Sequence, residues 1–174
     1  FAIPGSAQAF MIDWENGRLD VTSTDDPWDS GNARDIDKVW YAADADFHYF
    51  RMDLEQAPVY GGTNAGIYGI YIDAVPNAGS TAHHTYLPAH PGIDFALDSH
   101  FDSNMGQFYQ HDFHQWDDTN QVMQRMADPD GYSVTENSGR TLEWKISTAS
   151  LDGDFTWFAA THDHIEHVVQ LTWD

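Results

Sequence analysis

Cysteine is missing from this 174-residue chain. Its absence excludes disulfide bonds, thiolate zinc sites, iron–sulfur clusters and thiol catalysis. A chain of this length fits one domain and buries about 70% of the surface that its unfolded form exposes. Ten Phe, eight Tyr and seven Trp supply large apolar side chains for a core. The fold therefore needs no covalent or metal cross-link merely to have a core.

Basic residues are scarce. Seven Lys and Arg stand against 28 Asp and Glu, which gives a formal net charge of −21. Nucleic acid and anionic membranes are bound by basic surfaces, so we expect neither as a partner. Of the 28 acids, 23 are Asp and 5 are Glu. A halophilic surface, a merely soluble surface and Asp clusters for divalent cations all fit this composition, and the Asp bias favours the cations.

Long apolar runs are also absent. No stretch approaches the ~20 residues that a membrane-spanning helix needs. The chain begins at Phe1 without an initiator Met, and removal of a secretory signal is the simplest explanation. We therefore expect an extracellular or cell-surface protein.

Strand patterns occur along most of the chain. Phe50, Met52 and Leu54 share one parity, and Leu142, Trp144 and Ile146 do the same further on. Such alternation, rich in aromatic and β-branched residues, is typical of strands. The predicted strands are Asp35–Ala42, Phe47–Leu54, Ile67–Ala74, Ile93–Phe101, Gly106–Phe113, Gln121–Met126, Tyr132–Glu136, Thr141–Ser147, Phe155–Ala160 and His167–Trp173.

Turn residues separate these ranges, and no sustained helical period appears. Asn16-Gly17, Pro91-Gly92 and Asp152-Gly153 are examples of such turns. The expected fold is all-β: a single antiparallel β-sandwich, jelly-roll-like, of about ten strands. Residues 11–174 form the predicted domain, and residues 1–10 form an extended N-terminal arm.

The predicted arm carries no charge. Phe1, Ile3, Ala7 and Ala9 share one parity if the segment is extended. One interpretation is a frayed tail or the first edge strand of the same sandwich. The other is an assembly arm, a strand donated into the sheet of a neighbouring copy.

Asp-rich segments are the candidate metal sites. Ca²⁺ takes six to eight oxygen ligands, which converging loops can supply, although no segment matches the full EF-hand pattern. The alternative is that these Asp residues only begin turns. The region from 26 to 37 is the strongest candidate. The predicted calcium ligands are Asp26, Asp29, Asp35, Asp37, Asp44, Asp46, Asp128 and Asp130.

Ten His residues are many for this chain. Pairs occur at 83–84, at 111 and 114, and at 162 and 164. Neighbouring carboxylates are expected to raise the pKa values of these imidazoles, whose charge then offsets part of the acidity. We favour this interpretation over transition-metal binding, and we expect no haem.

The seven Trp residues divide into two groups. Trp144 and Trp157 are predicted core residues because they alternate with polar positions. Trp28 and Trp116 lie among Asp and turn residues, where an exposed ring could stack on a sugar or anchor a protein interface.

The order of several short motifs resembles a known family of sandwiches. An early Asp-Trp precedes a strand ending in Ala-x-Asp, followed by a Tyr-Phe strand and a Tyr-Ile-Asp strand end. The segments are Met11–Trp14, Asp35–Asp44, Phe47–Leu54, Gly69–Asp73, Gly92–Phe95 and Leu142–Leu151. Over roughly residues 11 to 160, this order is similar to the carbohydrate-binding family 9 and DOMON-like sandwiches of secreted proteins. The resemblance implies an antiparallel sandwich, often with structural calcium, that recognises sugar, haem or protein.

No catalytic motif stands out. The chain has no Gly-x-Ser-x-Gly elbow and no phosphate loop. We therefore expect a non-catalytic secreted subunit that polymerises into a filament, tube or matrix through strand donation and calcium-bridged acidic contacts. The alternative is a carbohydrate-binding module that holds a polysaccharide with Trp28, Trp116 or nearby Tyr side chains.

Overall fold

The computed structural model describes residues 20–21, 36–58, 66–74, 92–117, 119–126, 131–136, 140–162 and 169–173. These residues form strands, turns and short irregular stretches, with no helix among them. Accordingly, no helix in the described ranges has the length and apolar character needed to cross a bilayer. All of the described strand pairings are antiparallel.

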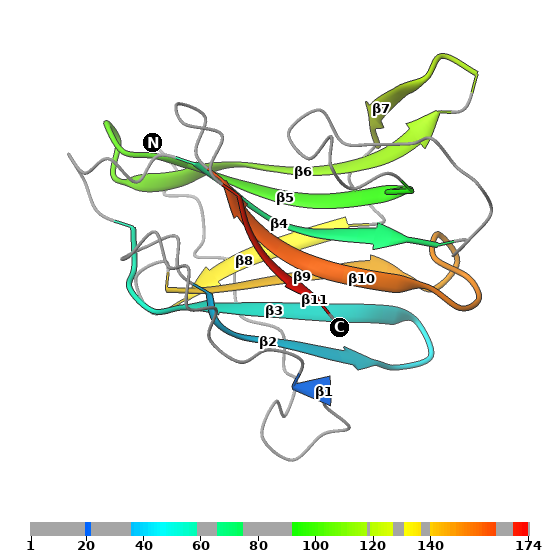
Figure 1. Cartoon of the computed structure of the whole chain (residues 1–174), viewed down its shortest axis with the longest axis horizontal. Helices are drawn as coiled ribbons and strands as arrows, with labels where there is room; N and C mark the ends of the chain where they lie inside the picture. Colours follow the sequence, from blue (N-terminus) through cyan, green and yellow to red (C-terminus); the bar gives the residue numbers. More distant parts are fainter. Residues whose placement is uncertain are drawn as a thin grey trace, which may run out of the picture.

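Two sheets make up the described structure (Figure 1). Sheet A has the order β1-β2-β3-β9-β8, and sheet B has the order β11-β10-β4-β5-β6-β7. The strand bounds are β1 Asp20–Val21, β2 Ile36–Ala43, β3 Phe47–Leu54, β4 Gly66–Asp73, β5 Phe95–Asp102, β6 Gln107–Asp117, β7 Val122–Arg125, β8 Gly131–Glu136, β9 Thr141–Ser147, β10 Thr156–His162 and β11 Val169–Trp173.

The predicted strand positions hold well. Phe47–Leu54 and Thr141–Ser147 match β3 and β9 residue for residue, and each of the other eight ranges overlaps one strand. The main differences are β1, which was not predicted, and β6, which continues four residues beyond the predicted end at Phe113. The extra residues of β6 are mostly polar and pair with β7, so their strand character comes from pairing rather than from alternation.

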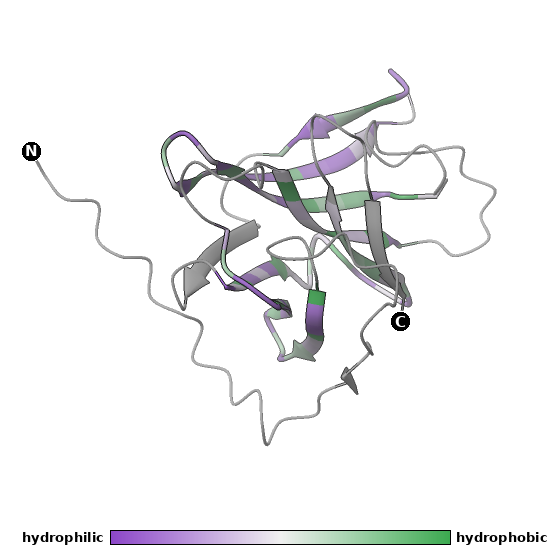
Figure 2. Ribbon diagram, turned by 60° about the vertical axis from the view of Figure 1, so that its left-hand side comes forward, coloured by the Kyte–Doolittle hydropathy of each residue, from purple (hydrophilic) through white to green (hydrophobic). Residues whose placement is uncertain are grey.

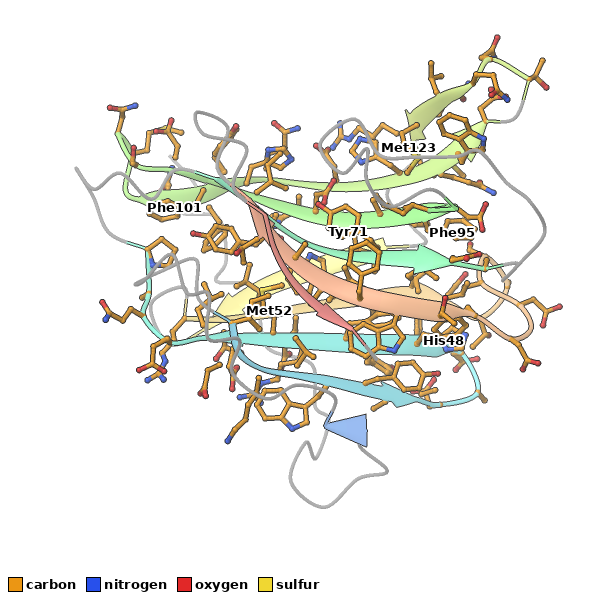
Figure 3. The ribbon with its side chains drawn as sticks, viewed as in Figure 1. His48, Met52, Tyr71, Phe95, Phe101 and Met123 are labelled. Carbon is orange, nitrogen blue, oxygen red and sulfur yellow. The ribbon has the colours of Figure 1, made fainter. Side chains whose placement is uncertain are left out.

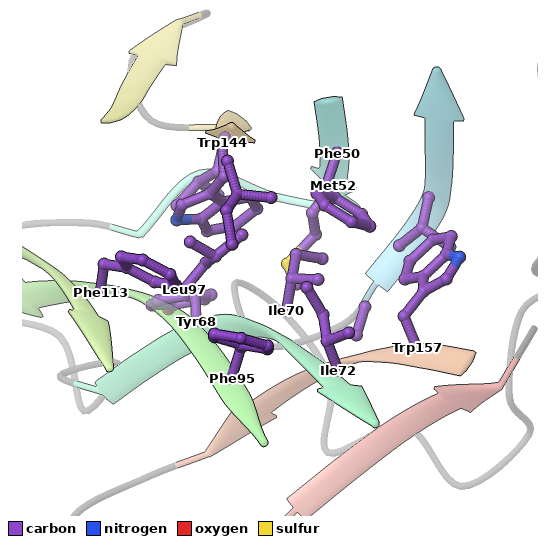
Figure 4. Close-up of a cluster of buried hydrophobic side chains, with 14 of the residues drawn as sticks. Phe50, Met52, Tyr68, Ile70, Ile72, Phe95, Leu97, Phe113, Trp144 and Trp157 are labelled. Carbon is purple, nitrogen blue, oxygen red and sulfur yellow. The ribbon is translucent and has the colours of Figure 1, made fainter. Parts of the chain in front are cut away.

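A single large core lies between the two sheets (Figure 4). Phe50, Met52 and Trp144 come from sheet A and face Tyr68 and Leu97 of sheet B. The shared parities predicted for β3 and β9 are therefore confirmed, and so are the core positions of Trp144 and Trp157. This arrangement of two antiparallel sheets around a common core is sandwich-like.

Sheet B is also buried on its other side. The first seven residues of β4 are buried, whichever way their side chains point. A second apolar cluster lies on the outer face of this sheet, the side away from the main core, and Met123 of β7 packs against it (Figure 3). Its members are Tyr71, Ile93, Ala96, Phe158 and Ala160. Hydrophilic and hydrophobic residues are otherwise mixed along the strands that are coloured by hydropathy in Figure 2.

Alternation along β9 gives the first prediction. Ile146 is fully buried in the main core, whereas its neighbour Lys145 points to the other face, 4.0 Å above the Phe47 ring. Ile146→Ala should lower the free energy of unfolding by about 2–5 kcal/mol, because it removes core volume. Lys145→Ala should cost less than about 1 kcal/mol, since it removes a partly exposed cation–π contact. Urea unfolding of both variants tests this difference, and equal losses would contradict the assigned faces.

Candidate functional site

The outer face of sheet B carries two buried carboxylates opposite one another. Asp98 of β5 pairs in register with Asp112 of β6, and Gly69 of β4 pairs with Asp98. Leu97 and Phe113 belong to the main core, so the alternating Asp side chains point to the outer face. The two carboxylate side chains are only 2% and 3% exposed. Burying two like charges side by side is costly unless cations and donors surround them.

Two imidazoles lie diagonally across this carboxylate pair. Nδ1 of His114 is 3.5 Å from Oδ2 of Asp98. Nε2 of His100 is 3.6 Å from Oδ2 of Asp112. The arrangement follows from the antiparallel register: each strand carries an Asp-x-His tripeptide, so pairing Asp with Asp places each His diagonal to the opposite Asp.

A guanidinium lies against one of the two carboxylates. Nε of Arg125 lies 2.5 Å from Oδ1 of Asp112, and Nε2 of Gln110 donates to the other oxygen of the same carboxylate. Arg125 belongs to the short strand β7, opposite His114. Its side chain is 60% exposed, whereas the Asp112 side chain is buried. The buried carboxylate thus orients a donor group that reaches the surface.

Trp116 lies at the end of this group. It follows His114 by two residues on β6, so its side chain points to the same face. Its cross-strand partner is Met123, which packs against the outer apolar cluster. The Trp116 residue is partly buried, whereas the sequence predicted an exposed ring.

Gly69 makes room beneath the carboxylates. A Cβ atom added at this position would lie 2.5 Å from Oδ1 of Asp98 and 2.9 Å from the Tyr71 hydroxyl. Both polar atoms therefore converge over the bare backbone of β4. We call Asp98, Asp112, His100, His114 and Arg125, with Gly69 and Tyr71 beneath them and Trp116 beside them, the outer-face site.

Only part of this site could be predicted from the sequence. Trp116 was predicted as a stacking residue, and His114 was noted as one of a pair. Asp98, Asp112 and Arg125 were missed because a polar residue in a strand resembles an ordinary solvent-facing position. The usable signal was the repeated Asp-x-His, at 98–100 and at 112–114.

Among the predicted calcium ligands, Asp44 already uses both oxygens within the β2–β3 turn. Oδ1 accepts hydrogen bonds from the backbone N–H groups of Asp46 and Phe47, and Oδ2 accepts one from the Tyr49 hydroxyl. These bonds lower the pKa of Asp44. Burial, followed by the hydrogen bond to Asp44, raises the pKa of Tyr49 to about 12. Asp44 thus serves the turn, which was the alternative interpretation of the Asp-rich segments.

Other turns use Asp in the same way. Asp117 accepts backbone hydrogen bonds from Thr119 and Asn120 between β6 and β7, and its side-chain and backbone bonds to Asn120 do most to lower its pKa. Asp102 accepts one from the backbone of Asn104 between β5 and β6. Much of the Asp content therefore has a local structural use.

The other predicted calcium ligands are not brought together in the described ranges. Asp37 lies 3.8 Å from Nη2 of Arg140, and Asp46 is exposed beside Asp44. Within the described ranges, no group of three or more His or acidic residues is arranged to hold a metal. Several predicted site residues lie outside those ranges: Asp26, Asp29, Asp35, Asp128, Asp130, Trp28, and Phe1, Ile3, Ala7 and Ala9 of the arm.

Comparisons with protein-family models, with curated proteins and with solved structures give no match to this chain. The resemblance to carbohydrate-binding family 9 and DOMON-like sandwiches therefore stays a prediction. The outer-face site has to be interpreted from its own geometry.

The position of Gly69 beneath the Asp98 carboxylate gives the second prediction. Gly69→Ala should lower the free energy of unfolding by about 1–3 kcal/mol, since the added methyl overlaps the Asp98 carboxylate and the Tyr71 hydroxyl. The same substitution in an Asp98→Ala background should cost less, because one of the two obstructing groups is gone. Thermal or urea unfolding of the four proteins measures this coupling. Equal costs in both backgrounds would show that Asp98 does not lie over Gly69.

Proposed function

We propose that this protein is a non-catalytic recognition module that binds carbohydrate at the outer-face site. One observation carries the proposal: buried carboxylates hold Arg125 and His114 on the same face of sheet B as Trp116. A sugar ring has an apolar face that stacks on an aromatic ring and hydroxyl groups that need directed hydrogen bonds. Trp116 offers the first, and the oriented side chains offer the second.

Arg125 is the main hydrogen-bond donor in this proposal. Asp112 engages its Nε, so the Nη groups are the ones a ligand would contact. A guanidinium held in place loses little side-chain entropy on binding, which favours affinity. His114 contributes a second polar group on this face, with its Nδ1 3.5 Å from Oδ2 of Asp98.

The charge of the chain favours a neutral ligand. A net charge of −21 repels anionic polysaccharides at long range, and Asp112 offsets the local charge of Arg125. Neutral glycans experience neither effect. We therefore expect neutral polysaccharides or their oligosaccharides as ligands.

The arrangement of the carboxylates supports a binding role rather than hydrolysis. A glycosidase needs one carboxyl that carries a proton to the leaving group. Asp112 is surrounded by Arg125, Gln110 and His100, an arrangement suited to an acceptor. Asp98 is likewise placed beside His114.

The finer structural and biological expectations remain part of the proposal. β3 and β4 lie in different sheets and pair with β9 and β10 respectively, which supports a jelly-roll-like path. Secretion, calcium binding and assembly through the N-terminal arm stay predictions. The arm and most of the proposed calcium ligands lie outside the described residues.

Ligand binding gives the third prediction. Titration calorimetry with soluble neutral glycans, such as xylan, mixed-linkage β-glucan and galactomannan, should reveal at least one ligand. Trp116→Ala and Arg125→Ala should each weaken binding about tenfold or more, because each removes a contact worth over about 1.4 kcal/mol.

Val122→Ala is the matched control for this experiment. Val122 is an exposed side chain on the same short strand as Arg125, so its loss should leave affinity unchanged. Unfolding midpoints should confirm that all three variants are folded. Wild-type affinity in Trp116→Ala, or binding only to anionic alginate, would contradict the proposal.

A further inference from the structure

A chain of hydrogen bonds joins the two sheets directly beneath the outer-face site. Nε1 of Trp144, on β9 of sheet A, lies 3.0 Å from Oγ of Ser99 on β5 of sheet B. The same Oγ lies 2.9 Å from Nδ1 of His111 on β6. Ser99 and His111 are paired in register. The contact therefore connects both sheets and the two strands that carry the buried carboxylates.

The donor fixes the direction of the hydrogen bond between the sheets. The indole N–H of Trp144 can only donate, so Ser99 Oγ accepts it. In the His111 tautomer that carries its proton on Nε2, Nδ1 accepts the Ser99 hydroxyl proton. A proton added at Nδ1 of this tautomer removes that acceptor from the Ser99 hydroxyl.

The surroundings of His111 also oppose its protonation. Burial lowers the pKa of His111, and the charge of His100 lowers it further, while Asp112 acts in the opposite direction. This corrects the expectation that carboxylates raise the pKa of the histidines, because for His111 burial outweighs its acidic neighbour. The ring of Phe108 stacks beside it, and β8, which carries Tyr132 and Glu136, packs near β6.

We propose that Trp144, Ser99 and His111 form an acid-sensitive joint that controls both the packing of the two sheets and the outer-face site. Protonation of His111 breaks the Ser99–His111 hydrogen bond and loosens β6 against β5. Asp98 and His100 flank Ser99, and Gln110 and Asp112 flank His111, so a shift of this pair moves the site on the opposite face. The Trp144–Ser99–His111 joint does not depend on the proposed carbohydrate binding. Only the control of ligand affinity rests on that proposed function.

The sign of the effect is fixed by linkage. The unfolded imidazole titrates near 6.5, and the folded-state pKa of His111 lies lower. The unfolded state therefore binds more protons as the pH falls below about 6.5. The stabilisation from neutral His111 is complete above that pH and is lost as the pH falls through the folded-state pKa.

Stability against pH is the first test and the fourth prediction. His111→Asn places an amide oxygen, which cannot titrate, near the position of Nδ1 and keeps an acceptor for Ser99. Between about pH 7.5 and about pH 5, the wild-type Tm should fall at least about 3 °C more than that of His111→Asn. Equal pH dependence in the two proteins would overturn the proposal.

Imidazole NMR of the wild-type protein is a second test that needs no stable variant. Long-range ¹H–¹⁵N correlation spectra should show His111 as the Nε2–H tautomer at neutral pH, with a titration midpoint below 6.5. The Nδ1–H tautomer, or a midpoint at or above that value, would contradict the joint.

Glycan titration at both pH values separates the two proposals. Wild-type affinity should drop at least about threefold more than His111→Asn affinity on acidification. If no glycan binds at either pH, the proposed function fails, while the stability and NMR tests still decide the joint. If a glycan binds with the same pH dependence in both proteins, the joint does not control the site.

Discussion

Burial of sheet B on both faces is the constraint on which the rest of this structure depends. One face of β4 and β5 closes the main core, and the other face is also removed from solvent. Polar side chains on the outer face are therefore costly unless they have partners within the protein. The outer apolar cluster has the Tyr71 hydroxyl as its one polar side-chain group, whereas the neighbouring outer-face site places Arg125 against Asp112 and one imidazole within 3.6 Å of each carboxylate.

Asp98 and Asp112 are two buried carboxylates side by side, which is an unfavourable arrangement in a protein with so few basic residues. Neighbouring carboxylates repel, and the chain has only seven basic residues to offset 28 acids. One of these seven, Arg125, is held against Asp112, and two imidazoles occupy the diagonals. If these positions served stability alone, apolar residues would serve it at least as well, since buried ion pairs add little stability over apolar packing. This cost is the physical reason for interpreting the group as a binding site.

Much of the fold could be predicted from residue alternation. The ranges of β3 and β9, the inward parity of Phe50 and Met52, and the core positions of Trp144 and Trp157 all followed from period-two patterns. The burial of the opposite faces could not be predicted in this way. Glu143 alternates away from the core yet is 1% exposed, and alternation along β9 does not indicate this burial. The outer-face site was missed for the same reason: it exists only through the register of β5 with β6, which brings two distant Asp-x-His tripeptides together.

Chemical-shift mapping tests the central claim most directly. A neutral oligosaccharide titrated into ¹⁵N-labelled protein should shift the Trp116 indole Nε1–H, the Arg125 Nε–H and the backbone amides of β5, β6 and β7. The chemical shifts of the backbone amides of β2, β3 and β9 in sheet A should not change, apart from small changes near Trp144. Shifts confined to sheet A, or no shifts with any neutral glycan that the protein retains, would contradict the outer-face site as the place of recognition.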